Sequence, residues 1–239
     1  MYSSVNIERI LFVDIETVPQ SAGYDCLDDS MRQLWDKKAA TLVRYDSGGN
    51  GSSPAQLYER AGIYAEFGKV VCVSAAFIRD GKLYVKSYAS HIEKEILSAF
   101  AELVAKHFGT AECRLCGHNL KEFDLPYLCR RMIVNGVPIP KTMNLMGRKS
   151  WDNMHIDTLD MWKFGDYKHY TSLELLATTM GIPSPKDDID GSEVAEVYWT
   201  NKDLSRIATY CEKDTITVAQ LFLKMTGRET IKHDYIIIK

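Results

Sequence analysis

The chain has 239 residues, of which 46% are hydrophobic and 26% charged, and its formal net charge is -3. This length supports a substantial core, and we expect one domain spanning residues 1–239. The slightly negative charge excludes a globally basic nucleic-acid binder but leaves room for a local basic face. The segment 1–9 is too polar for a signal peptide and the apolar runs are too short for a membrane span, so we expect a cytoplasmic protein that does not enter a membrane.

The first half of the chain predicts three strands. A buried strand is expected over residues 9–15, because Ile10-Leu11-Phe12-Val13 is continuously apolar. A second strand is expected over residues 69–78. The Asp80-Gly81 pair favours a tight turn, and residues 83–88 then return as a third strand. The second and third strands therefore form a hairpin.

The second half alternates helices with short strands. Apolar residues recur at helical spacing over residues 91–108, and residues 114–117 favour a fourth strand. A helix is expected over residues 125–135, where Gly136 and Pro138 end it, and residues 155–159 favour a fifth strand. Further helices are expected over residues 172–180, 193–200 and 204–225. This order predicts an α/β fold with a mixed five-stranded central sheet flanked by helices and with the first strand in the centre.

A long connection separates the first two strands. Residues 19–66 are treated as an insert, since a short loop would suffice there, and they contain a Gly/Ser-rich stretch over residues 47–54. We expect the segment 30–45 to help hold a nucleic-acid strand and the segment 47–54 to act as a hinge. The cations and aromatic residues that suggest this role are Arg32, Trp35, Lys37, Lys38, Arg44 and Tyr45. The alternative is a surface excursion without a binding role.

Two acids end the first strand. Asp14 and Glu16 stand at positions i and i+2, so their side chains share one face of the strand. The carboxyl end of a central strand is where a mostly parallel sheet places its ligand site. Ionisable groups at the end of a buried strand cost free energy unless something binds them, and this favours a functional pair.

Two more acids recur in informative contexts. Asp124 stands at the start of a predicted helix, where a carboxylate can also serve the helix dipole. Tyr210 and Asp214 are spaced i, i+4 and share a helix face. On this spacing alone, a core tyrosine beside a surface acid is an equally good interpretation. His118 is expected to be structural, since hard-metal sites prefer oxygen ligands.

Carboxylates gathered from distant segments repel one another unless cations neutralise them. Hard divalent ions such as Mg²⁺ bind carboxylate oxygens and suit phosphate chemistry. The order Asp14, Glu16, Asp124 and Asp214 therefore points to hydrolysis of a phosphodiester with two divalent cations, Mg²⁺ or Mn²⁺.

Three segments carry a family resemblance. LFVDIET, GHNLKEFDLPYL and YCEKD are similar to the three exonuclease motifs of the DEDD 3′–5′ exonuclease superfamily, which has a ribonuclease H-like fold. Tyr210 marks the tyrosine subclass, because Thr209 stands where the other form has His. Within this subclass the chain resembles freestanding bacterial exonucleases related to the exonuclease domain of family B DNA polymerases. FGKVVCVSAAF, HIDTLDMWKFG, TSLELL and IPSPKDDIDGSEV extend the likeness.

The resemblance implies a role for each site residue. Asp14, Glu16, Asp124 and Asp214 would hold the two cations, with Asp14 bridging them. Tyr210 would orient the attacking water, since a phenol with a pKa of about 10 is a poor base at neutral pH. Thr17, Asn119 and Phe123 would bind the substrate, which is expected to be the 3′ end of single-stranded DNA. A packing role for Phe123 under the following helix is an equal alternative.

Two other functions stay open on the sequence. An RNA 3′–5′ exonuclease resembling ribonuclease D would use the same carboxylates, and no reader of the 2′-hydroxyl is identifiable. A nucleic-acid-binding module with a decayed site is the third possibility, and the intact carboxylates argue against it. Arg130 and Arg131 could contact phosphates, although such a pair on a helix is usually a solvated face.

Overall fold

The structure is a computed structural model that describes residues 2, 5–45, 52–149, 152–166, 170–183 and 189–239. Its core is a six-stranded mixed sheet with the strand order β5-β4-β1-β2-β3-β6. The strands are β1 (Ile10–Pro19), β2 (Gly68–Arg79), β3 (Lys82–Ala89), β4 (Arg114–Gly117), β5 (Ile156–Asp157) and β6 (Ile236–Ile238). β1 is antiparallel to β2 and parallel to β4, and β3 is parallel to β6. The predicted α/β class and the central position of the first strand are confirmed.

The sheet has six strands, so the prediction of five was wrong. Ile236, Ile237 and Ile238 pair with Leu83, Tyr84 and Val85 at the edge formed by the hairpin. Three successive β-branched residues favour a strand. This segment was missed because it stands alone near the end of the chain, without a neighbouring strand in sequence that would pair with it.

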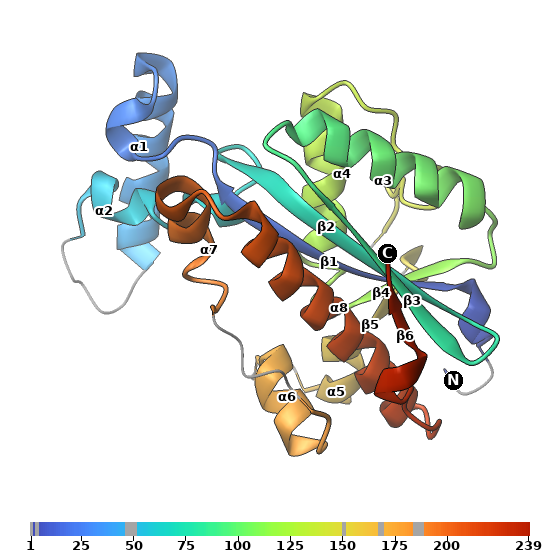
Figure 1. The fold of residues 1–239 in the computed structure, drawn as a ribbon. Coiled ribbons are helices and arrows are strands. Elements are labelled where there is room, and N and C mark those ends of the chain that lie inside the picture. Colours follow the sequence, from blue (N-terminus) through green and yellow to red (C-terminus); the bar gives the residue numbers. More distant parts are fainter. Residues whose placement is uncertain (1, 3–4, 46–51, 150–151, 167–169, 184–188) are drawn as a thin grey trace.

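Helices cover both faces of the sheet (Figure 1). Their bounds are α1 (Asp29–Tyr45), α2 (Pro54–Tyr58), α3 (Glu93–His107), α4 (Asp124–Val134), α5 (Thr158–Lys163), α6 (Leu173–Thr179), α7 (Val194–Glu196) and α8 (Leu204–Met225). α7 continues into a π-helix over Val197–Asn201. The fifth strand was predicted over residues 155–159, but the observed strand β5 covers only Ile156–Asp157 because α5 begins at Thr158. Within the described parts of the chain, no helix is both long and apolar enough to span a bilayer.

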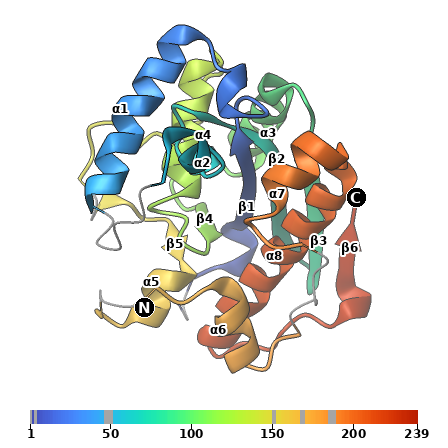
Figure 2. The same cartoon turned by 90° about the vertical axis from the view of Figure 1, so that its left-hand side faces the viewer.

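The side chains of β1 alternate between the two faces. Leu11, Val13 and Ile15 pack in the core beneath α3 and α4. Ile10 and Phe12 pack on the opposite face, against Val218 and Phe222 of α8, among others. Figure 2 shows α4 and α8 on opposite sides of β1. This alternation with period two directs Asp14 and Glu16 toward α8.

The insert is an ordered unit with its own small core, not a bare loop. Trp35 of α1 is fully buried, and its ring lies edge-on to those of Tyr58 and Phe67, with centroids 5.3 and 5.0 Å away. Its indole N–H donates to the carbonyl of Pro54 at 2.7 Å. The expectation that Trp35 faces a nucleic-acid strand was therefore wrong. The proposed hinge lies largely outside the described residues.

Candidate active site

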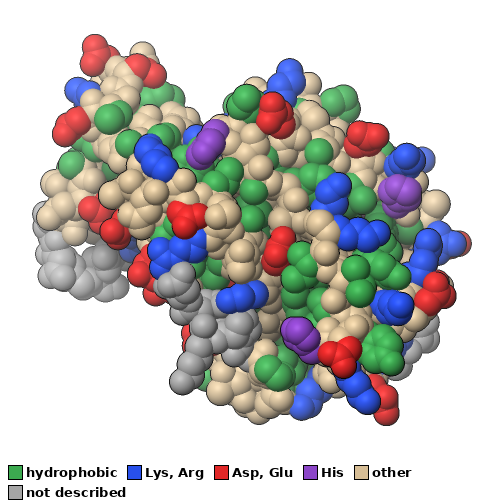
Figure 3. All heavy atoms as spheres, viewed as in Figure 1, with side chains coloured by type: hydrophobic (Ala, Val, Ile, Leu, Met, Phe, Trp, Pro, Cys, Tyr) green, Lys and Arg blue, Asp and Glu red, His purple; other side chains and the backbone are tan. Residues whose placement is uncertain are grey.

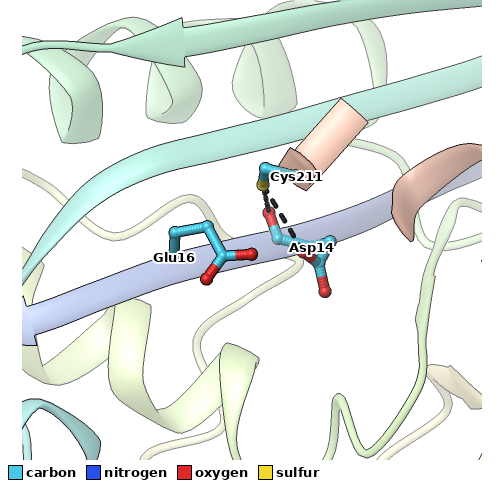
Figure 4. A group of neighbouring side chains, drawn as sticks. All are labelled: Asp14, Glu16 and Cys211. Atoms are coloured by element: carbon cyan, nitrogen blue, oxygen red, sulfur yellow. Dashed lines mark hydrogen bonds between the residues drawn. The ribbon is translucent and has the colours of Figure 1, made fainter. Parts of the chain in front are cut away.

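Asp14 and Glu16 lie side by side on β1, with Cys211 of α8 above them (Figure 4). Ligand atoms of these three side chains lie within 4.8 Å of one another. The Cys211 thiol donates to the carboxylate Oδ2 of Asp14 and to its backbone carbonyl, each at 3.4 Å. A β-bulge follows directly, between Glu16 and Thr17. Bulges are common beside active sites because they redirect the chain after a functional pair.

α8 brings Tyr210 and Asp214 to the same place. Asp203 caps the helix by accepting a hydrogen bond from the N–H of Arg206 at 3.0 Å. One turn separates Tyr210 from Asp214, and their side chains form a hydrogen bond on the face that meets β1. Tyr210 therefore packs against the buried cluster around Val71 and Ile207 and also lines the cavity beside Asp214.

Asp124 reaches the site from the far side of β1. β4 pairs only with Ile10, Leu11 and Phe12, so it leaves the later N–H groups of β1 without a strand neighbour on that side. The carboxylate of Asp124 accepts a hydrogen bond from the N–H of Ile15 at this edge. The end of β4 also lies close to β1, because a Cβ added at Gly117 would lie 3.0 Å from the carbonyl oxygen of Val13.

The electrostatic surroundings of the carboxylates on β1 and α4 disfavour negative charge. Burial, followed by mutual repulsion, raises the pKa values of Asp14 and Glu16 well above their usual range. Burial raises the pKa of Asp124 to about 7, and the nearby Asp157 adds to this shift. Among the described residues, no Lys or Arg contributes to the shifts at Asp14 and Glu16. This oxygen-rich donor set is what Mg²⁺ and Mn²⁺ prefer, so the residues fit the expected metal ions.

The side chain of Asp157 fixes the backbone of the loop that precedes Asp124. The Asp157 carboxylate is 2% exposed and accepts hydrogen bonds from the backbone N–H groups of Asn119 and Lys121 at 2.9 and 3.0 Å. It also caps α5 through the N–H of Leu159 at 2.9 Å. Asn119 adopts a left-handed conformation with φ of 66°, which costs free energy outside glycine. Asp157 therefore stabilises the strained turn that positions Asp124.

His118 is structural, as expected. Its Nδ1 lies 2.9 Å from the hydroxyl of Thr158, and its Nε2 lies 2.8 Å from the carbonyl of Thr171. These bonds connect the loop before α4 to the starts of α5 and α6. Burial lowers the pKa of the imidazole.

A cavity of about 640 Å³ joins these side chains. All five predicted catalytic residues line it, and so do Asn119 and Phe123. Phe123 is half-buried and packs beside Tyr127 at a centroid distance of 5.4 Å, which confirms the packing interpretation, while its contact with substrate stays a prediction. Thr17 is not among the described lining residues, because its side chain turns to the hydroxyl of Tyr127 on the other face.

Several lining or supporting residues were missed by sequence reasoning. They are Asp157, Tyr170, Ser172, Leu173, Glu174, Ile189, Asp190, Gly191, Glu193, Cys211 and Thr217. HIDTLD, TSLELL and IPSPKDDIDGSEV, which contain all of these residues except Tyr170, Cys211 and Thr217, belonged to the resemblance without any role. The predicted helix gave a signal for Cys211, because this residue is adjacent to Tyr210 in the sequence, and its thiol contacts Asp14 of β1.

Comparisons with known proteins identify the family and the fold of the chain. A family model described as a predicted 3′–5′ exonuclease related to the exonuclease domain of PolB matches residues 63–234. The matched range contains Asp124, Tyr210 and Asp214, and it begins after Asp14 and Glu16. None of the curated proteins matches the chain.

Among solved structures, the family B DNA polymerase of the hyperthermophilic archaeon Pyrobaculum calidifontis is similar to the chain. The TM-score is 0.52 at 18% sequence identity, over 88% of this chain and 24% of the polymerase. The chain thus spans about a quarter of that polymerase, and the likeness confirms the ribonuclease H-like fold. Because the family model covers well over half of the chain, the chain belongs to the family of predicted 3′–5′ exonucleases related to the exonuclease domain of PolB.

Proposed function

We propose that the protein hydrolyses phosphodiester bonds from the 3′ end of single-stranded DNA by a two-metal mechanism of the tyrosine subclass. The observation that carries the proposal is the set of four carboxylates on β1, α4 and α8 that line one cavity, where burial and repulsion between neighbouring acids raise the pKa values of Asp14 and Glu16.

Asp14, Glu16, Asp124 and Asp214 would hold two divalent cations, Mg²⁺ or Mn²⁺. Such cations, when bound, activate water and stabilise the charge that develops on the phosphate. Without them, the raised pKa values of Asp14, Glu16 and Asp124 favour protonated carboxyl groups. Metal binding then displaces protons, so activity should require a pH at which these carboxyl groups release them.

Tyr210 would aim the attacking water. Burial and the charge of Asp214 raise its pKa, so the phenol stays protonated at neutral pH and serves as a hydrogen-bond donor or acceptor instead of a base. The hydrogen bond with Asp214 fixes the hydroxyl beside a proposed metal ligand. Orientation is therefore the role that its chemistry supports.

Asn119 and Phe123 would contact the strand next to the cleaved bond. Asp157 fixes the backbone of Asn119 at the cavity wall. Phe123 offers a half-buried ring, and an aromatic ring can stack on any base. Thr17 remains a proposed contact only through the backbone beyond Glu16, since its side chain bonds Tyr127.

The test is a metal-dependent digestion of matched single-stranded DNA and RNA oligonucleotides labelled at the 5′ end. We expect the DNA to shorten stepwise from its 3′ end with release of 5′-mononucleotides, in Mg²⁺ or Mn²⁺ and not in EDTA. Faster digestion of the RNA would favour the ribonuclease D-like alternative. Cleavage of a circular single strand would overturn the exonuclease assignment, and binding without cleavage would favour a decayed module.

A further inference from the structure

The proposed active-site cavity is acidic beyond its metal ligands. Glu174, Asp190 and Glu193 also line it, and no Lys or Arg is found among its described lining residues. The face in Figure 3, by contrast, carries interspersed basic and acidic side chains. A nucleotide in the cavity would find no ion pair for its phosphates from these walls. Its affinity would then come from bound cations, from neutral hydrogen-bonding groups such as that of Asn119, and from apolar or aromatic side chains.

Tyr170 is the most accessible aromatic residue that lines the cavity. It is 68% exposed, and its ring lies edge-on to His118 with centroids 6.4 Å apart and an interplanar angle of 70°. Partial burial raises the pKa of the Tyr170 hydroxyl, and the negative charges of Asp124, Asp157 and Asp14 add to this shift. Tyr170 therefore lies within electrostatic range of the proposed metal ligands while much of its surface stays open.

The backbone beside Tyr170 is fixed at two points. The carbonyl of Thr171 lies 2.8 Å from Nε2 of His118, so this segment is tied to the loop that precedes Asp124. Ser172 caps α6 by accepting a hydrogen bond from the N–H of Leu175 at 3.3 Å. An exposed ring on an anchored backbone can stack on a ligand at a low cost in conformational entropy.

The ring of Phe123, which also lines the cavity, is less available for stacking on a base. Phe123 packs against the core beneath α4 and beside Tyr127, so part of its surface is already covered. Tyr170 is more exposed and belongs to none of the hydrophobic clusters given for the described residues.

We propose that Tyr170 stacks on the base of the 3′-terminal nucleotide while the carboxylate side of the cavity receives the scissile phosphate. The inference rests on the proposed exonuclease function and adds a residue that positions the substrate. Every base has a π face, so stacking gives affinity without sequence preference. His118 contributes indirectly, because it anchors the carbonyl next to the ring.

The test combines variants with modified DNA ends. Tyr170→Ala and Tyr170→Phe are compared with wild type on two single strands, one with a normal 3′-terminal base and one with an abasic 3′ terminus. Base stacking on an aromatic residue typically contributes about 5- to 150-fold in affinity. We expect Tyr170→Ala to lose kcat/KM by a factor in that range on the normal end, mainly through KM, and Tyr170→Phe to keep most of it.

On the abasic end, wild type and Tyr170→Ala should be equal, since the base that the ring would contact is missing. Tyr235→Ala is the matched control, because Tyr235 is 49% exposed and precedes β6 at the far edge of the sheet. An equal loss on normal and abasic ends overturns the stacking role. A loss in Tyr170→Phe as large as in Tyr170→Ala overturns it as well, because the hydroxyl would then be the active group.

A binding measurement separates this inference from the proposed function. Fluorescence of a 3′-terminal 2-aminopurine is followed with Ca²⁺ in place of Mg²⁺, for wild type and Tyr170→Ala. Stronger quenching by wild type supports stacking even if no strand is ever cut. Equal quenching, or binding by neither protein, overturns the inference, while cleavage by wild type would leave the exonuclease function standing.

Discussion

Glu16 and Glu93 are buried to the same extent, each with 8% of its surface exposed, but their electrostatic surroundings are opposite. Glu93 receives two hydrogen bonds from the guanidinium of Arg131, at 2.8 and 2.6 Å, and a third from the N–H of Val70 at 2.8 Å. Glu16 faces Asp14, Asp124 and Asp214. The negative charge of Glu93 is neutralised by Arg131 within the fold, whereas the negative charge of Glu16 would be neutralised by a bound metal ion.

The difference separates stability from function. The Glu93–Arg131 pair joins α3 to α4, and Arg131 also donates to the carbonyl of Ala65 in the insert at 2.8 Å. No Lys or Arg among the described residues contributes to the pKa shifts of Asp14 and Glu16, so their burial and the repulsion from neighbouring acids oppose folding in the absence of metal. Substitutions at the two sites should therefore act on different quantities.

The largest effect is expected from the metal ligands. Asp14→Asn and Asp214→Asn keep the side-chain size but remove the negative charge that holds a cation. Metal-assisted stabilisation of the transition state contributes several kcal/mol, so turnover should fall by at least about 10³-fold. The measurement is kcat on labelled single-stranded DNA over a range of Mg²⁺ concentrations. Glu102→Gln, an exposed acid on α3, is the control, and near wild-type turnover in either site variant would remove that residue from the metal site.

The second effect falls on stability. Arg131→Met leaves Glu93 as an unpaired buried charge, which typically costs about 3–5 kcal/mol. Urea denaturation should show this loss, while the kcat of the folded fraction stays close to that of wild type. Arg130→Met is the matched control, since Arg130 is the exposed neighbour on the same helix. A double substitution of Glu93→Leu with Arg131→Met should recover much of the stability, because replacing both partners with apolar groups is often neutral.

The two sites also differ in how far the sequence predicts them. Asp14 and Glu16 were identifiable because a strand end and its alternation are local patterns. Tyr210 and Asp214 were ambiguous on spacing alone, and the motif context made them candidates. The Glu93–Arg131 pair spans 38 residues and has no local signal, so Arg131 was assigned to a solvated face or a phosphate contact, and both were wrong.

Tertiary packing explains the other differences. Trp35 was assigned to a binding surface because it stands among cations on α1. Its partners Tyr58 and Phe67 come from beyond the Gly/Ser stretch, and this distance in sequence hid the small core. Asp157 and Tyr170 belong to segments that approach Asp124 only in the folded chain, so neither had a pattern that marked it as part of the site.

A third effect concerns the tyrosine at the metal cluster. Tyr210→Phe removes the hydroxyl and its hydrogen bond with Asp214 but leaves the carboxylates in place. Orienting groups contribute about 10²–10⁴-fold, and we expect a loss in kcat near the low end of that range. The Mg²⁺ concentration for half-maximal activity should change little. Tyr84→Phe on β3 serves as the control, and wild-type kcat in Tyr210→Phe would make the tyrosine merely structural.

The fourth effect is a pH dependence of the metal-free protein. The pKa of Asp124 is about 7 in the fold and about 3.9 when unfolded, so the folded state binds more protons between these values. Asp14 and Glu16 shift in the same direction. Their contribution to stability is therefore fully present below about pH 4 and is lost as the pH rises through the folded pKa values.

Thermal unfolding in EDTA should accordingly show that this contribution decreases from pH 5 to pH 8. Mg²⁺ should restore stability at pH 8, because it supplies the charge that the fold lacks there. Asp124→Asn should flatten the pH dependence, whereas Glu102→Gln should not. A wild-type profile with the same slope as Asp124→Asn would contradict the uncompensated cluster.

The smallest effect concerns the basic side chains of α1 that would bind the DNA strand outside the cavity. Lys37 and Arg44 on the outer side of α1 are exposed, whereas Lys38 lies over the ring of Tyr64 at 4.3 Å. Removing residues 30–54 would destroy the core around Trp35, so a surface double variant, Lys37→Ala with Arg44→Ala, is the cleaner test of a binding role.

Each lost phosphate contact on a single strand lowers the slope of log affinity against log salt by about 0.7. The double variant should therefore bind long oligonucleotides slightly less tightly with a slope reduced by up to about 1.4, while a dinucleotide is hydrolysed at the wild-type rate. Lys82→Ala with Lys106→Ala, two exposed cations on the hairpin and α3, is the matched control. An unchanged slope in the α1 variant would show that the insert serves the fold alone, tied to α4 through Ala65 and Arg131.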